Sequence, residues 1–155
     1  MRRTRLRSAV LCAAVTLTAA GCGTGAGGAP AVPEIDGARD LRGLDPCGLV
    51  ADEQTQRLEL PPEGVAGSAP EGPRCTWSDQ ATELTVVLYV HGGGIATLAE
   101  NSEPTTARVR VAGFPALETF TEDGAYCQYD VGVAADQVLL AGLAGGEPDS
   151  CTALQ

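Results

Sequence analysis

Apolar and polar residues alternate along much of the second half of this chain. Apolar residues occupy every second position from Leu84 to Val90, and Cys75 and Trp77 share one side of the stretch before it. A period of two is typical of a β-strand whose two faces meet different surroundings. We therefore expect strands between residues 74 and 90, separated by a turn.

The same pattern predicts further short strands toward the C-terminus. They are expected over residues 107–111, 116–121, 126–134 and 137–143, with turns at Gly124 and at Ala135–Asp136. Strands this close in sequence pair antiparallel, because a tight turn can join only antiparallel neighbours.

The N-terminal side of the predicted sheet has helical features instead. Asp45 and Pro46 suit the cap and first position of a helix, the helical pattern runs from Cys47 to Leu60, and Pro61–Pro62 ends it. Residues 61–73 are expected to be a loop, and residues 95–101 a brief helical turn.

Together these elements predict an α+β fold. We expect a single small antiparallel sheet of about five short strands, covered on its apolar face by the N-terminal helical segment and held by two disulfides. A chain of 155 residues normally forms one domain, which we place at residues 41–155.

Residues 1–21 have the pattern of a signal peptide. A basic head with Arg2, Arg3, Arg5 and Arg7 precedes an apolar run from Ala9 to Gly21. This run is shorter than the roughly 20 apolar residues that a membrane-spanning helix needs. We therefore expect export followed by cleavage.

The cleavage region, Ala19-Ala20-Gly21-Cys22, resembles a bacterial lipobox. Small residues before the cut fit a narrow protease site, and the thiol after it carries a diacylglyceryl thioether. We expect Cys22 to be lipidated, with fatty acyl chains such as palmitate holding the protein on the extracytoplasmic face of the cell membrane. Residues 22–40 are rich in Gly, Ala and Pro and are expected to be a flexible linker.

Charge narrows the range of partners. Four of the 10 basic residues precede Cys22 and all 20 acidic residues follow it, so cleavage there changes the formal net charge from −10 to −14. Such a surface repels phosphate backbones, and we expect no nucleic-acid partner. The acidic residues lack the spacing of a calcium loop, and we expect no metal and no cofactor.

Four cysteines remain after the leader and the lipidation site: Cys47, Cys75, Cys127 and Cys151. Export places them in an oxidising compartment, and none has the C-x-x-C spacing of a zinc or redox site. We expect two disulfides. Three pairings are possible, and loop entropy alone does not choose between them; we favour Cys47 with Cys75 and Cys127 with Cys151, which close the shorter loops.

Several short motifs stand in a distinctive order behind the lipobox. They are LDPCGLV (Leu44–Val50), CTW (Cys75–Trp77), GFPA (Gly113–Ala116) and YCQYDVGVAADQVLLAG (Tyr126–Gly142), followed by Cys151. In this the chain resembles the actinobacterial lipoproteins grouped as domain of unknown function 3558. The resemblance implies an envelope lipoprotein with a frame of four cysteines, and it supplies no activity and no catalytic residue.

The stretch LYVHGGG, from Leu88 to Gly94, invites comparison with the oxyanion loop of lipases and esterases. Such an enzyme also needs a G-x-S-x-G nucleophile elbow and a separate histidine base. No serine of this chain lies in a G-x-S-x-G sequence, and His91 is the only histidine. We therefore expect a strand end that enters a turn, no catalytic residues, and a protein that is not an enzyme.

The remaining candidate residues are expected to be structural. His91 carries an imidazole, the side chain used most often as a pH sensor, but it is more simply an ordinary residue at a strand end. Trp77, two residues from Cys75, is expected to pack on the disulfide in the core. Tyr126 and Tyr129 fall on opposite faces of their strand, so at most one of them points outward.

Two functions fit these features. The first is a membrane-tethered, extracytoplasmic, non-catalytic binding module for an unknown envelope protein or ligand. The second is a carrier of lipid or another apolar molecule, which requires a cavity of several hundred Å³ between the sheet and the helices.

Overall fold

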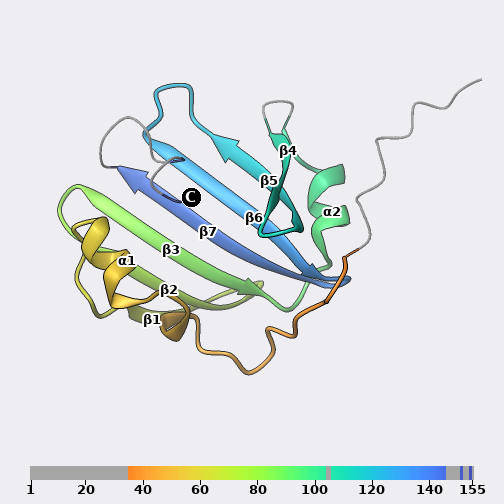
Figure 1. Cartoon of the computed structure of the whole chain (residues 1–155), viewed down its shortest axis with the longest axis horizontal. Coiled ribbons are helices and arrows are strands. Elements are labelled where there is room, and N and C mark those ends of the chain that lie inside the picture. The colour runs from red at the N-terminus through yellow and green to blue at the C-terminus, as the bar shows by residue number, and fades with distance from the viewer. Residues whose placement is uncertain (1–34, 104–105, 146–150, 152–153, 155) are drawn as a thin grey trace, which may run out of the picture.

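Seven antiparallel strands form one sheet in the order β1-β2-β3-β7-β6-β5-β4 (Figure 1). The computed structural model describes residues 35–103, 106–145, 151 and 154. The expected signal peptide, the expected lipidation site Cys22 and most of the expected linker lie outside the described residues. Among the described residues, no helix has the length and hydropathy needed to cross a membrane.

The elements follow one another with short connections. The 3-10 helix η1 covers Pro46–Leu49, and the α-helices are α1 (Asp52–Arg57) and α2 (Ile95–Glu100). The strands are β1 (Val65–Ala69), β2 (Gly72–Ser78), β3 (Thr82–Tyr89), β4 (Ala107–Val111), β5 (Phe114–Phe120), β6 (Tyr126–Ala134) and β7 (Gln137–Gly145). The chain thus builds two antiparallel groups, β1–β3 and β4–β7, which join where β3 pairs with β7.

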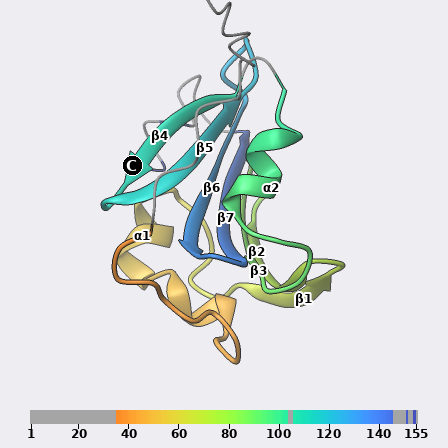
Figure 2. The ribbon, with the colours of Figure 1, turned by 90° about the vertical axis from the view of Figure 1, so that its right-hand side faces the viewer.

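Alternation along the strands gives the sheet two different faces. The core face carries the main apolar cluster, in which Trp77, Leu88 and Leu143 are almost completely buried. η1 packs on this face, against β2 and β3. On the opposite face, Ile95 and Ala99 of α2 pack with Leu117 and Val138. Figure 2 shows α1 and α2 on opposite sides of the twisted sheet.

The approach of α2 to the sheet depends on a glycine. A Cβ at Gly132 of β6 would lie 2.5 Å from a side-chain carbon of Ile95. No larger residue fits there unless the helix moves. The helix thus contacts β6 at this glycine and β5 beside it.

The expected sheet of about five strands is wrong, because the sheet has seven. The main omission is β1, which lies in the stretch expected to be a loop. β1 pairs in register with β2, from Val65 opposite Thr76 to Ala69 opposite Gly72. It is an edge strand whose residues are nearly all exposed. Neither of its faces has to be apolar, and its sequence therefore shows no alternating pattern.

The expected α+β fold with helical cover is also wrong, because the molecule is mostly sheet with two short α-helices. The helix expected over residues 47–60 is broken into η1 and α1. Val50 and Ala51, which lie between them, have extended backbone angles. The break follows the end of a four-residue 3-10 turn that Asp45 caps through a hydrogen bond from the Cys47 N–H.

The N-terminal segment attaches to the sheet before the first helix begins. The Arg39 N–H donates to the Val133 carbonyl at 2.8 Å, and the Leu41 N–H donates to the buried Gln137 side chain at 2.6 Å. Ile35 packs beside the α2 cluster. The contacts of the folded part therefore begin within the stretch that was expected to be linker.

Both disulfides have the pairing that we favoured. Cys47 of η1 is bonded to Cys75 of β2, and Cys127 of β6 is bonded to Cys151. Trp77 is 1% exposed and lies in the same cluster as Cys75, so its expected place in the core is confirmed. A Cβ at Gly64 would meet both the Cys75 sulfur and the Trp77 ring, which shows how closely the chain before β1 crosses them.

Candidate ligand pocket

A pocket of about 460 Å³ lies between the N-terminal helical segment and the core face of the sheet. Its apolar lining comes mainly from Val50, Leu58, Leu84, Val86, Leu139 and Ala141. This volume falls in the range of about 300–1,000 Å³ that is typical of sites for small molecules.

The floor of the pocket follows from the pairing of β3 with β7. Val86 stands directly opposite Ala141, and Leu84 opposite Leu143. Residues paired across antiparallel strands point to the same face, so these side chains form one apolar surface. Ala141 is the smallest of the floor residues, and its short side chain leaves open space above the middle of the strand pair.

The cover of the pocket comes from segments outside the sheet. Leu49 ends η1 and Val50 follows it, Leu58 follows α1, and Leu154 contributes from the C-terminal end of the chain. Each disulfide anchors one of these segments, since Cys47 lies in η1 and Cys151 is three residues before Leu154. The pocket is thus bordered by two parts of the chain that are covalently fastened to the sheet.

The polar lining residues, Gln54 and Arg57, both come from α1. The Gln54 side-chain oxygen accepts a hydrogen bond from the Ala51 N–H at 2.8 Å, which fixes the residue at the start of the helix. Arg57 is exposed at the last position of α1 and forms no ion pair with any described residue. No acidic side chain is among the lining residues.

The lining residues offer two kinds of contact to a ligand. Aliphatic side chains gain free energy when an apolar ligand removes their surface from water. Gln54 and Arg57 can donate hydrogen bonds to a polar group at one side. None of the lining residues is a nucleophile or a carboxylic acid that could transfer protons.

Two titratable residues with a raised pKa, Tyr126 and Asp130, lie along β6 on the opposite face of the sheet. Gln128 donates a hydrogen bond to Asp130 at 2.8 Å and accepts one from the Tyr126 hydroxyl. Burial raises the pKa of Asp130, and this effect exceeds the lowering by the Gln128 amide. Burial also raises the pKa of Tyr126, with a further contribution from the charge of Asp130.

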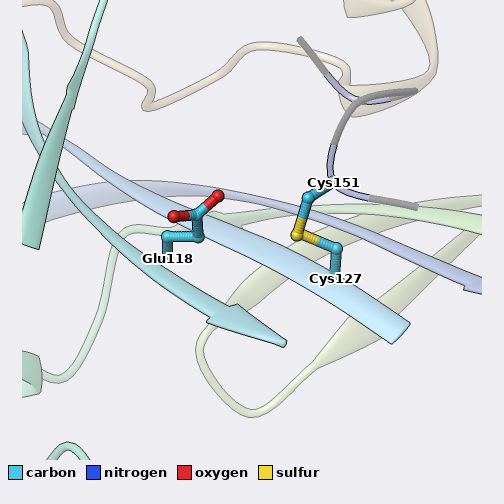
Figure 3. A group of neighbouring side chains, drawn as sticks. All are labelled: Glu118, Cys127 and Cys151. Carbon is cyan, nitrogen blue, oxygen red and sulfur yellow. A yellow bond between two sulfur atoms is a disulfide. The ribbon is translucent and has the colours of Figure 1, made fainter. Parts of the chain in front are cut away.

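Glu118, Cys127 and Cys151 bring one potential metal-binding atom each to within 4.8 Å of one another (Figure 3). The two sulfur atoms, however, are bonded to each other and offer no thiolate. The Tyr129 hydroxyl donates a hydrogen bond to the Glu118 carboxylate. This arrangement is that of a disulfide beside a hydrogen-bonded carboxylate.

The single residues considered from the sequence lie outside the pocket. His91 is exposed just after β3, and the glycines that follow it lead into α2. Trp77 is in the core and does not line the pocket. Tyr126 and Tyr129 do point to opposite faces, with Tyr129 buried in the main cluster and Tyr126 half-buried on the other side.

Sequence reasoning missed the pocket itself. A signal for its polar side was present, because Gln54 and Arg57 are three residues apart and therefore share one face of the predicted helix. No sequence signal marked the floor of the pocket. Inward-facing Leu, Val and Ala residues give the same sequence pattern whether other side chains pack on them or a pocket lies above them.

Comparison with known proteins identifies one family. The model of the family described as Protein of unknown function (DUF3558) matches residues 17–155. No curated protein and no solved structure matches the chain.

Proposed function

We propose a binding function for this chain, which belongs to the family described as Protein of unknown function (DUF3558). The description of that family assigns no activity. The match confirms the family that the sequence motifs indicated. In this proposal, the protein acts as a membrane-tethered, extracytoplasmic, non-catalytic binding module. Its ligand is an apolar molecule that enters the pocket between α1 and the strand pair β3–β7.

The observation that carries this proposal is the pocket of about 460 Å³ with an aliphatic floor. The aliphatic side chains that line the pocket remain partly accessible to water. A ligand that covers them removes this apolar surface from water, which is favourable. The two disulfides hold its borders in place, which favours a preformed site.

The place of action is inferred from the N-terminal sequence. Lipidation at Cys22 would fasten the chain to the outer surface of the membrane, and the stretch rich in Gly, Ala and Pro after it would act as a tether. A pocket held close to a bilayer meets apolar molecules at high local concentration. The proposed partners are accordingly the membrane, through the anchor, and an envelope ligand.

The same pocket also favours a carrier as the second candidate function. A carrier and a simple binding module share the site and differ in the fate of the bound ligand, because a carrier must release it to an acceptor. Transfer of a bound fluorescent ligand to empty vesicles, at a rate that depends on the protein, would distinguish the carrier from the binding module.

The binding proposal is tested with N-phenyl-1-naphthylamine, a neutral apolar probe whose fluorescence rises in apolar surroundings. The protein used is residues 22–155 with Cys22→Ser, which retains every described residue and avoids detergent that would occupy the pocket. We expect saturable binding at one site per chain. Ala141→Phe should weaken it at least tenfold, because the added ring fills the space above the floor.

The matched control is Ala144→Phe, the same change on the same strand but on the opposite face. We expect this variant to bind the probe as the unmodified chain does. Both variants retain Trp77 as the single tryptophan, so its emission reports whether each is folded. Absence of saturable binding, or an equal effect of the two substitutions in folded protein, would contradict the proposed site.

A further inference from the structure

The charge of the pocket is opposite to the charge of the chain. The whole chain has a formal net charge of −10, whereas the pocket lining includes one arginine and no acidic residue. An acidic protein repels anions over most of its surface. Arg57 therefore gives the lining a positive charge, although Asp52 and Glu53 stand in the first turn of the same helix.

Arg57 is available to a ligand. It forms no ion pair and no side-chain hydrogen bond with any residue that the structure describes. Its neighbour in the lining, Gln54, uses its side-chain oxygen to accept from Ala51, while its amide nitrogen has no partner among the described residues. One side of the pocket thus offers a guanidinium and an amide donor together, and both suit a carboxylate or phosphate oxygen.

The polar lining residues are confined to one element, although apolar Val50 and Leu58 lie on the same side of the pocket. Both polar residues lie on α1, whereas the floor on β3 and β7 consists of aliphatic side chains such as Leu84 and Leu139. A ligand that satisfies the whole lining must have an apolar body at the sheet and an oxygen-rich group at the helix. A neutral hydrocarbon leaves the donors of α1 unused, and a cationic amphiphile meets the like charge of Arg57.

We infer that the pocket takes a single-chain amphiphile with an anionic head group, its tail lying over β3 and β7 and its head group bound by Arg57. This inference rests on the proposed binding function and specifies the chemical class of its ligand. Fatty acids and single-chain lipid phosphates share the chemistry in question, a carboxylate or phosphate on one alkyl chain.

The test compares dodecanoate with dodecanol, which has the same tail and no charge, by displacement of N-phenyl-1-naphthylamine near neutral pH. Residues 22–155 with Cys22→Ser serve again as the protein. We expect dodecanoate to bind about fivefold more tightly than dodecanol, as for an ion pair at the upper end of the exposed range. Arg57→Gln should remove this preference, and added salt should reduce it. Dodecyl phosphate in the same series distinguishes a phosphate head from a carboxylate.

Arg74→Gln is the matched control, because Arg74 is an exposed arginine on β2 outside the pocket lining. It removes the same charge from the protein and should leave the preference for dodecanoate unchanged. Equal loss in Arg57→Gln and Arg74→Gln, or equal binding of dodecanoate and dodecanol, would overturn the head-group inference while leaving the binding function intact. If the probe binds saturably and neither compound displaces it, the head-group inference is wrong and the binding function stands. If the probe itself does not bind saturably, the proposed function is wrong as well.

Discussion

At the scale of single residues, Asp130 is the clearest departure from what its position in the sequence suggests. It occupies a polar site in the alternation of β6, yet it is 7% exposed, with Gln128 as its hydrogen-bond partner. Burial disfavours the charged carboxylate and raises the pKa of Asp130. Alternation along β6 places Asp130 on the face opposite the core. Whether that face is buried depends on elements that are far away in the sequence.

We predict that Asp130→Asn stabilises the protein more at neutral pH than at low pH. As pH rises from the unfolded-state pKa of about 3.9, the unfolded chain releases the Asp130 proton before the native protein does, so native stability falls until the raised pKa is passed. Asparagine removes this loss and can still accept from Gln128. Denaturant unfolding followed by Trp77 emission at several pH values measures the difference.

Asp123→Asn provides a control of opposite sign. The Thr121 hydroxyl and then the Ala125 N–H lower the pKa of Asp123, so its contribution to stability is present at neutral pH and is lost as pH falls through the lowered pKa. Its removal should destabilise the protein at neutral pH and have less effect in acid. A gain from Asp130→Asn that is the same at every pH would contradict the account of its burial.

At the scale of elements, alternation predicted the strands whose core-facing residues are apolar. β3 and β6 were expected with boundaries close to those observed, because their inward residues are apolar and their turns contain Gly or Asp. β1 was missed because an exposed edge strand needs no apolar side. The N-terminal helix was expected to be continuous because the turn residues at Val50 and Ala51 are apolar and carry no sign of a break.

The disulfide between Cys47 and Cys75 should support both the fold and the pocket. Its loop spans 28 residues, and the chain-entropy model gives a loss of about 3.5 kcal/mol in the free energy of unfolding for Cys47→Ala/Cys75→Ala. The double variant should also bind N-phenyl-1-naphthylamine more weakly, because η1 is no longer fastened over β2. Urea unfolding and probe titration of the same samples measure the two effects.

The titration is made at a temperature where circular dichroism shows the double variant to be folded, so that a loss of affinity reflects the pocket. A stability loss of the expected size with unchanged probe affinity would show that the disulfide does not shape the pocket. Since small domains have unfolding free energies of about 5–15 kcal/mol, the variant should remain folded in water.

At the scale of the whole molecule, the candidate site joins parts of the chain that are far apart in sequence. Arg57 of α1 and Ala141 of β7 line the same pocket, although more than half of the chain lies between them. Each segment alone has an ordinary pattern, a short amphipathic helix and a buried strand. The hollow arises only from the way the broken helical segment sits over the β3–β7 pair, which local periodicity does not encode.

The most direct test of the proposed function is methyl NMR of residues 22–155 with Cys22→Ser during titration with N-phenyl-1-naphthylamine. The strands carry an internal control, because Leu84, Val86 and Leu139 line the pocket while Val87, Val138 and Leu140 belong to the other face. We predict that the methyl signals of the first three shift with the probe and that those of the second three do not. Equal shifts on both faces, or none at the pocket, would contradict the account.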